Sequence, residues 1–399
     1  MFPLSVRTRH SPLIPGTFCF PDQMSNTAKL LNELIALPSV NPAFLPPGDR
    51  WAGEQRVADF VAVTAARAGL DIEFQRALPG RVNLIARLRP KGRPARTILL
   101  APHLDTVPVA DESQFVPHKQ GDRVYGRGAC DTKGSVAAML SAIMALAKSG
   151  RRPRQTEIIF AGLVDEENGQ AGSRALARSS LKADLAIVGE PTSLKVVTAH
   201  KGNIWFQFNT RGKNAHGSRP ELGRNAIHMM ARIVEAIETD YATMLRKRRR
   251  HPLLGHATVN VGTIRGGTQP NIVPDSCVIT VDRRTLPGET EAGVKREMMN
   301  FLAHKKVAAV CLARNAPCLP METRAKLPLV QQFLRSIGQR KPMGVNYFCD
   351  AAVLAEGGIP SVVFGPGDIA YAHRPDEWIP LPELERAKEM LVRFLSLQP

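Results

Sequence analysis

The chain has 399 residues, of which 44% are hydrophobic, so it is long enough for two or three domains with substantial cores. Its 53 Lys and Arg residues outnumber its 36 Asp and Glu residues, and the net charge of +17 favours anionic substrates or nucleic acid. Mean hydropathy is −0.14, and no apolar run reaches the ~18 residues that a membrane span needs. We therefore expect no membrane partner.

The beginning of the chain carries no continuous apolar signal core, because prolines interrupt it. A clean amphipathic helix is predicted only from Met24 onward, so we expect residues 1–23 to be a disordered extension, with an over-long gene start as the alternative. The six cysteines are scattered and form no C-x-x-C pair, which is typical of reduced thiols. We therefore expect a cytoplasmic protein.

Helices and short strands alternate in the first half of the chain. Helices are predicted over 24–40, 52–70 and 134–150, and strands over 81–88, 96–102, 156–164 and 183–190. This alternation predicts an α/β domain with a mostly parallel central sheet.

The pattern changes after Pro191, where the order becomes β-α-β-β-α-β up to residue 313. This order predicts a small α+β, ferredoxin-like unit. The α/β pattern then resumes with a helix over 327–338, a strand over 360–367 and a helix over 381–397. We therefore expect residues 24–192 and 316–399 to form one domain, with residues 193–315 inserted as a second.

The densest basic run, residues 246–251, follows a predicted helix. No aromatic residues interleave with it as they would in a base-stacking surface. A solvated helix end explains this run, so nucleic acid is a disfavoured partner.

Potential metal ligands follow four of the predicted strands of the α/β domain. His103 and Asp105 follow the strand over 96–102, Glu190 ends the strand over 183–190, and a glycine turn after residues 360–367 leads to His373. An acidic cluster, 165–167, follows the strand over 156–164, and Asp131 lies at the entrance of a helix. Ligands of open α/β sheets bind at the carboxyl ends of the strands, so these side chains are expected to meet.

Each residue alone has a structural explanation, such as a core histidine, a helix cap at Asp131 or solvated loop acids. Together they suit two divalent metal ions, most simply zinc, with cobalt or manganese as substitutes. If Asp131 bridges, His103 and Glu190 hold one ion, while Glu167 and His373 hold the other. Two such ions polarise a carbonyl and activate water.

Glu166 and Glu167 point in opposite directions if the segment is extended, so one is expected to coordinate metal and the other to act as general base. Asp105, two residues after His103, is placed to hydrogen-bond the imidazole and orient it.

The blocks HLDTVP, GRGACDTKGS, VDEENGQAGS, GEPT and AHRPDE resemble those of the acetylornithine deacetylase / succinyl-diaminopimelate desuccinylase family. These co-catalytic zinc amidohydrolases are related to glutamate carboxypeptidases and aminoacylases. The blocks occur in family order from about residue 25 to the end. The resemblance implies the same five ligands, with Glu166 as the base, Asp105 as a supporting residue and a zinc-peptidase-like fold.

The resemblance also assigns roles in the inserted domain, which serves as a lid and usually dimerises in this family. The block GKNAH implies that His216 stabilises the oxyanion in the partner subunit's site. Two further blocks imply substrate contacts by Asn271 and by Arg284, whose guanidinium suits a carboxylate. Arg283, on the opposite strand face, is expected to be replaceable.

The expected function is therefore hydrolysis of the amide bond of an N-acyl amino acid. A di- or tripeptidase or carboxypeptidase on the same scaffold is an alternative. A non-catalytic protein that binds anionic ligands or nucleic acid is a more distant one, and it has no need of Glu166.

Overall fold

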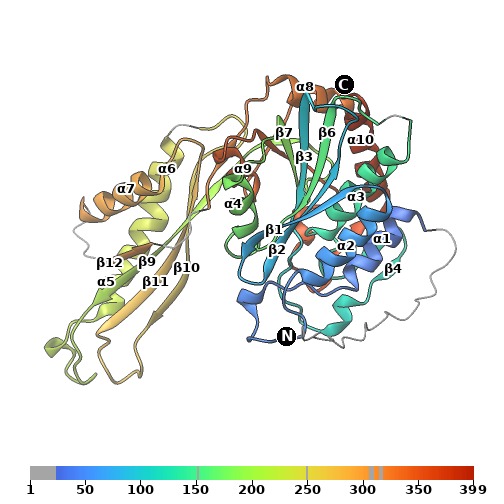
Figure 1. Cartoon of the computed structure of the whole chain (residues 1–399). Coiled ribbons are helices and arrows are strands. Elements are labelled where there is room, and N and C mark those ends of the chain that lie inside the picture. The colour runs from blue at the N-terminus through green and yellow to red at the C-terminus, as the bar shows by residue number, and fades with distance from the viewer. Residues whose placement is uncertain (1–23, 151, 249, 305–309, 314–317) are drawn as a thin grey trace, which may run out of the picture.

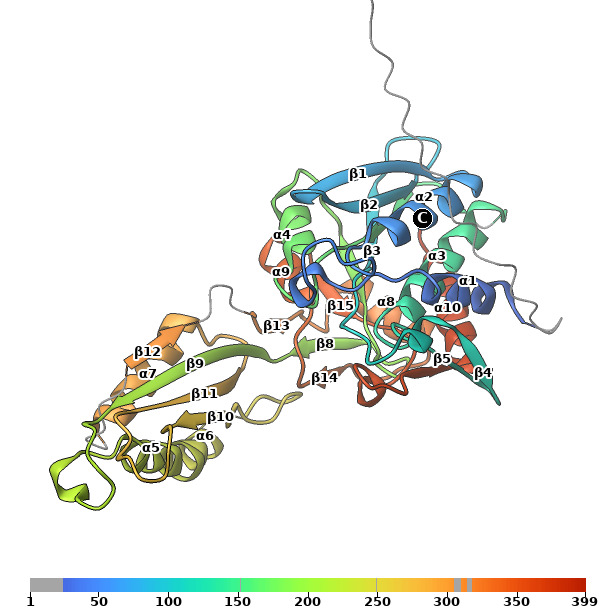
Figure 2. The same cartoon turned by 90° about the horizontal axis from the view of Figure 1, so that it is seen from below.

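A computed structural model describes residues 24–150, 152–248, 250–304, 310–313 and 318–399 (Figure 1). The predicted extension, residues 1–23, and the predicted domain boundary at 315/316 lie outside these residues. Two separate sheets dominate the architecture, a large one in the body of the molecule and a smaller one beside it (Figures 1 and 2).

The large sheet has the strand order β1-β2-β6-β3-β7-β15-β8-β13, and β14 also pairs with β8. Its strands are β1 (Asp71–Leu78), β2 (Arg81–Leu88), β3 (Arg96–Pro102), β6 (Thr156–Gly162), β7 (Leu185–Gly189), β8 (Val197–His200), β13 (Met321–Glu322), β14 (Met343–Val345) and β15 (Ser361–Val363). The centre, β6-β3-β7-β15, is parallel, as predicted. The flanking pairs β1/β2, β2/β6, β15/β8 and β8/β13 are antiparallel.

Helices cover both faces of the large sheet, which explains why its central strands are continuously apolar. One core contains residues of α1 (Asn26–Ile35), α2 (Gln55–Arg67), α3 (Lys133–Ala147), α8 (Pro328–Ser336) and α10 (Leu381–Ser396). The opposite core is smaller and includes α4 (Ala171–Arg178) and α9 (Ala351–Glu356). Helix α3 is buried almost all round, because it packs against both the sheet and α10.

The second sheet has the antiparallel order β10-β11-β9-β12, which is consistent with the ferredoxin-like unit predicted from the succession of elements along the chain. Its strands are β9 (Gly202–Arg211), β10 (Thr258–Gly266), β11 (Ser276–Thr285) and β12 (Val310–Ala313). One face packs on α5 (Ala226–Glu235), the π-helical turn η4 (Ala236–Tyr241), α6 (Ala242–Lys247) and α7 (Glu291–His304) (Figure 1). Residues of β11 alternate between this core and the opposite face.

A narrow crossing joins the two sheets. Only Lys201 separates β8 from β9, and the chain returns through Cys318 to β13. Asn203 N donates to Cys318 O at 2.8 Å, and Thr323 N donates to Thr198 O at 2.8 Å. A Cβ at Gly202 would lie 2.5 Å from Cys318 O, so this position requires glycine.

Several features were not predicted, among them the helices α4 and α9 and the short strands β13 and β14. Strand β1 alternates between exposed and half-buried residues, so no apolar run marks it. The segments β4 (His118–Gln120), β5 (Arg123–Tyr125) and β16 (Trp378–Pro380) form a small third sheet from strands too short to show periodicity. The first helix of the predicted β-α-β-β-α-β unit is interrupted by the π-helical turn. Within the described residues, no helix has the length and apolar character needed to traverse a bilayer.

Candidate metal centre

The parallel centre of the large sheet brings the predicted ligands to one edge. His103 directly follows β3, Glu190 directly follows β7, and Glu167 lies in the turn after β6. His373 lies beyond β15 with a left-handed backbone, φ 63°. Asp131 precedes α3, and its neighbour Thr132 occupies the cap position, so the structural alternative of a capping role for Asp131 is wrong.

The five side chains form two groups that share Asp131. His103 Nε2 lies 3.0 Å from Asp131 Oδ1 and 3.9 Å from Glu190 Oε1. His373 Nε2 lies 3.1 Å from Asp131 Oδ2 and 3.2 Å from Glu167 Oε1. The two oxygens of Asp131 thus face different histidines, which is the arrangement that a bridging carboxylate needs.

This donor set fits metal binding. Ligand atoms of His103, Asp131 and Glu167 all lie within 4.8 Å of one another. Glu190 Oε1 is buried and has no hydrogen-bond partner among the described residues, although an unpaired buried carboxylate oxygen is costly. Nitrogen and carboxylate donors of this kind suit zinc, cobalt or manganese.

The ionisation of the cluster indicates the same need for a cation. Burial raises the pKa of Glu167 to about 7, and the charge of Asp131 adds to this effect. Burial, with help from neighbouring carboxylates, raises the pKa values of Glu166 and Glu190 well above their usual range. Hydrogen bonds from His373 to Asp131 and Glu167 raise the histidine's pKa to about 10. Without metal, protons compensate the charge that metal ions neutralise.

The Asp105 carboxylate supports the acidic turn rather than acting mainly on His103. Its Oδ1 accepts from Glu166 N at 3.1 Å, and its Oδ2 accepts from Glu167 N at 3.1 Å. Asn41 Nδ2 also donates to Oδ2, at 2.7 Å. The nearest contact of His103 Nδ1 is the backbone carbonyl of Asp105 at 3.0 Å, while the carboxylate lies at 3.4 Å. Asp105 therefore holds the backbone from which Glu166 and Glu167 project.

A buried polar network lies behind this turn and was missed by sequence reasoning. Asp165 Oδ1 accepts from Asn41 Nδ2 at 3.1 Å and from Arg81 Nη1 at 2.9 Å. Arg81 also pairs with Glu54, whose Oε1 accepts from Asp165 N at 3.1 Å. Asn41, Glu54 and Arg81 are far apart in sequence and stand in no distinctive pattern, so no local signal marks them.

The paired glutamates have different neighbours. The Glu167 carboxylate contacts His373, whereas the charges that act most strongly on Glu166 are those of Glu190 and His103.

His216 and Asn271 lie away from the cluster, at the tip of the second sheet. His216 belongs to the loop after β9, and Asn271 to the loop between β10 and β11 (Figures 1 and 2). Gly217 N donates to Asn271 O at 2.7 Å, and His216 Nδ1 lies 2.7 Å from Ser218 Oγ. Among the described residues, no hydrogen bond or ion pair joins His216 to the metal-ligand cluster.

Arg284 lies on the sheet face opposite the helices. Its Nε donates to Asp282 Oδ1 at 3.0 Å, and its guanidinium carbon lies 5.9 Å from the centre of the Phe348 ring. Phe348 belongs to the body of the molecule that contains the large sheet, so Arg284 lies where the second sheet contacts that body.

The sequence did not predict that Arg283 is buried and paired with an acid. Arg283 is 0% exposed, its Nη2 lies 2.7 Å from Glu289 Oε1, and its Nε donates to the Tyr241 hydroxyl at 3.2 Å. The alternation of residues along the strand predicts that Arg283 and Arg284 lie on opposite faces, but it does not predict the ion pair of Arg283 with Glu289.

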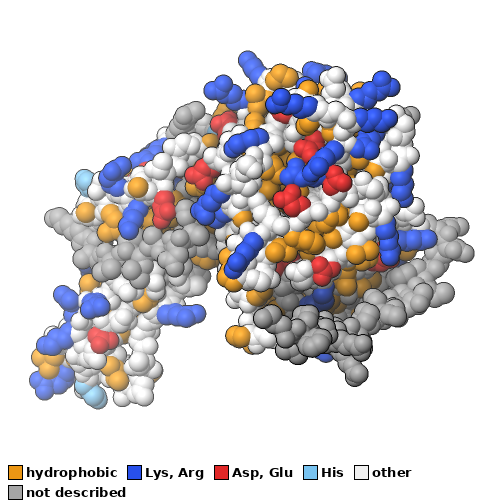
Figure 3. All heavy atoms as spheres, viewed as in Figure 1, with side chains coloured by type: hydrophobic (Ala, Val, Ile, Leu, Met, Phe, Trp, Pro, Cys, Tyr) orange, Lys and Arg blue, Asp and Glu red, His pale blue; other side chains and the backbone are white. Residues whose placement is uncertain are grey.

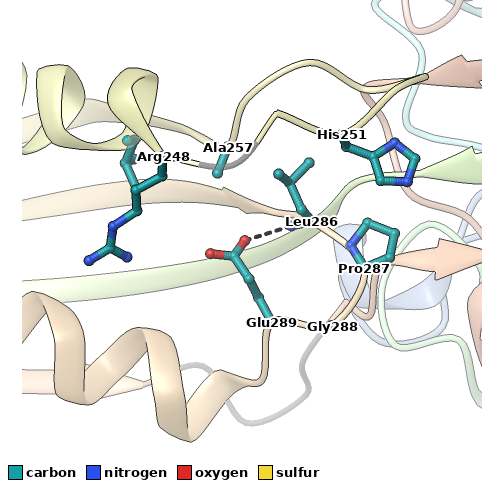
Figure 4. A pocket seen from close by; sticks show the side chains of 8 residues that line it. Arg248, His251, Ala257, Leu286, Pro287, Gly288 and Glu289 are labelled. Atoms are coloured by element: carbon teal, nitrogen blue, oxygen red, sulfur yellow. Dashed lines mark hydrogen bonds between the residues drawn. The ribbon is translucent and has the colours of Figure 1, made fainter.

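A separate cavity of about 230 Å³ lies beside the second sheet (Figure 4). None of the predicted site residues lines it. Glu289 accepts from Leu286 N at 2.7 Å, and His251 Nδ1 accepts from two backbone amides. The polar groups of these two lining residues are thus satisfied within the protein.

Comparison with known proteins places these features in a family. Residues 99–397 match Peptidase family M20/M25/M40. The acetylornithine deacetylase of Myxococcus xanthus is 32% identical over 358 residues, which cover 85% of this chain and 90% of that protein.

Two solved structures show the same fold. The M20 metallo-carboxypeptidase Sso-CP2 of Sulfolobus solfataricus has a TM-score of 0.75 at 21% identity, covering 94% of this chain and 99% of its own. The Bacillus subtilis YXEP protein, described as a dinuclear metal-binding peptidase, has a TM-score of 0.66 at 14% identity, covering 93% and 97%. The chain therefore belongs to Peptidase family M20/M25/M40 and is a hydrolase that acts on amide bonds.

Proposed function

We propose that the protein removes the acyl group from an N-acyl amino acid, as an acetylornithine deacetylase or a succinyl-diaminopimelate desuccinylase does. The observation that carries the proposal is the division of five ligands into two groups around Asp131. The relatedness to acetylornithine deacetylases favours a deacylase among the hydrolases of this family.

The proposed centre holds two divalent ions, most simply zinc, through His103, Asp131, Glu167, Glu190 and His373. When bound, the ions polarise the amide carbonyl and lower the pKa of water. Glu166 would take a proton from a water molecule as the water attacks the amide carbonyl carbon, and would deliver that proton to the leaving amine as the C–N bond breaks, as a general base that then acts as general acid. Asp105 keeps Glu166 and Glu167 in place through their backbone amides.

The proposed substrate carries a free α-carboxylate that pairs with Arg284, and Asn271 adds a polar contact. His216 stabilises the oxyanion of the tetrahedral intermediate from the partner subunit. This arrangement requires a homodimer through the inserted unit, predicted over residues 193–315, attached to a catalytic part predicted over 24–192 and 316–399. Because β8 pairs within the large sheet, the part of the inserted unit that forms the second sheet begins at β9. The exposed position of His216 at the sheet tip supports action between subunits rather than within one.

Nucleic acid is disfavoured as a partner. On the face seen in Figure 3, Lys and Arg side chains are spread over both parts of the molecule rather than gathered in one stripe. The net charge of +17 instead steers small anionic substrates to a protein that we place in the cytoplasm.

The test is a substrate screen of the purified protein loaded with zinc or cobalt. N-acetyl-ornithine, N-succinyl-diaminopimelate, other N-acyl amino acids and dipeptides are compared by kcat/KM, with Glu166→Gln as the inactive control. Preference for an N-acyl amino acid supports the proposal. Faster cleavage of di- or tripeptides would instead establish the peptidase alternative.

A further inference from the structure

The side chain of Glu377 is 1% exposed and accepts four hydrogen bonds from one short segment. Its Oε1 accepts from Cys130 N at 2.8 Å and Asp131 N at 2.9 Å. Its Oε2 accepts from Gly128 N at 3.1 Å and Arg127 Nη1 at 2.5 Å. One buried carboxylate thus accepts hydrogen bonds from four donors within residues 127–131.

These hydrogen bonds set the shape of a segment that has no helix or strand to define it. Gly126 and Gly128 have φ values of 148° and 82°, which side-chain-bearing residues rarely adopt. The backbone amides at 128, 130 and 131 find their acceptor in Glu377. An acceptor at this point is required, because unpaired buried amides are costly.

The last amide in this group belongs to Asp131, whose two carboxylate oxygens face His103 and His373. Glu377 follows His373 by only four residues. One short segment, 373–377, therefore supplies a candidate ligand and also fixes the backbone of the residue that lies between the two histidines.

We infer that Glu377 is a positioning residue of the metal centre, which holds Asp131 in the orientation needed to bridge two metal ions. The inference rests on the proposed metal centre and adds a residue that touches no ligand atom. Its counterpart on the other side is Asp105, which binds the amides of Glu166 and Glu167 in the same way. Partners of this kind typically change metal affinity by about 10–100-fold.

The experiment compares Glu377→Gln with the unaltered protein and with Glu289→Gln. Glutamine places an amide group against one pair of donors, because both carboxylate oxygens of Glu377 are acceptors in the structure. Glu289 is the matched control, since it accepts from a buried arginine and a backbone amide within the second sheet (Figure 4). Each protein is loaded with zinc, its metal content is counted, and metal release to a chromogenic chelator is timed.

We expect the unaltered protein and Glu289→Gln to retain two zinc ions, and Glu377→Gln to release at least one of them about 10–100-fold faster. The melting temperature measured in excess chelator should fall by a similar amount in Glu377→Gln and Glu289→Gln. Equal release rates in Glu377→Gln and the unaltered protein would overturn the inference. If the unaltered protein itself binds no metal pair, the proposed function fails, which is a different result.

If Glu377→Gln does not fold, the same measurements are made on Glu377→Asp. This side chain keeps the charge beside Arg127 but is too short to reach all four donors. Faster release from folded Glu377→Asp supports the inference, and unchanged release overturns it. If neither variant folds while Glu289→Gln does, Glu377 is required for the fold itself and the positioning role is rejected.

Discussion

The candidate functional residues at the edge of the large sheet and those at the tip of the second sheet differ in burial and in contacts. At the edge, His103, Asp131 and Glu190 are buried, and backbone hydrogen bonds fix their surroundings. At the tip, His216 is exposed, and within the described part of the chain its imidazole hydrogen-bonds with its near neighbour Ser218. The first region is organised within one chain, whereas the role that we propose for the second requires a partner subunit.

The largest expected effect comes from substitutions in the metal-ligand cluster at the edge of the large sheet. Glu166→Gln should lower kcat by about 10²–10⁴-fold, because it removes the general base, yet leave metal content unchanged. Glu167→Gln should instead lose metal, since its carboxylate contacts His373. Metal analysis alongside kinetics measures both. Metal loss in the Glu166 variant with retention in the Glu167 variant would reverse the two roles.

The next largest expected effect comes from His216, at the tip of the second sheet. His216→Ala should lower kcat by about 10²–10³-fold if the imidazole is an oxyanion donor. Mixing this variant with Glu166→Gln should restore activity, because a mixed dimer then contains one complete site. Subunit exchange is verified independently with tagged chains. Exchange without recovery would place His216 outside the partner's site.

A stability effect separates the two neighbouring arginines. Arg283→Met should destabilise the protein by about 3 kcal/mol, near the lower end for breaking a buried ion pair, because Glu289 is partly exposed. Denaturant unfolding measures the change. Arg284→Met, at a half-buried position, should leave unfolding nearly unaltered. A stable Arg283→Met variant would show that the ion pair contributes little.

Arg284→Met should lower kcat/KM for N-acyl amino acids by about ten- to a hundredfold, the value of one charge-assisted hydrogen bond. The corresponding α-amides lack the carboxylate and should be affected little. Parallel kinetics on an acid and its amide provide the measurement. Equal losses on both would assign Arg284 a structural role.

The smallest effect concerns pH. The raised pKa values mean that the metal-free site holds protons, on Glu167 below about pH 7 and on His373 below about pH 10. Metal must displace these protons, so affinity falls as pH falls, by about tenfold per pH unit for each proton released. Chelator competition at pH 6, 7 and 8 measures it. Affinity that is independent of pH would contradict this ligand set.

The sequence predicts the α/β class, the ferredoxin-like strand order and the residues at the strand ends, because all of these depend on local periodicity. It does not predict the partners of Asp105 or the burial of Arg283, because these depend on which distant segments meet. Glu377 illustrates the limit. It stands in a quoted block, but its role depends on a segment nearly 250 residues earlier in the chain.

The narrow crossing between the sheets has a mechanical consequence. Hydrogen bonds on both sides of Lys201 bind the outgoing and returning segments, so the crossing bends as one ribbon rather than as two independent tethers. A rotation of the second sheet relative to the large one would change the backbone angles at this crossing and also the other contacts between them, such as that of Arg284 with Phe348. A methyl group at Gly202 would meet Cys318 O at 2.5 Å. Gly202→Ala is therefore expected to shift the crossing itself, together with the β9/β11 pairing in which Gly202 lies opposite Thr285, the neighbour of Arg284.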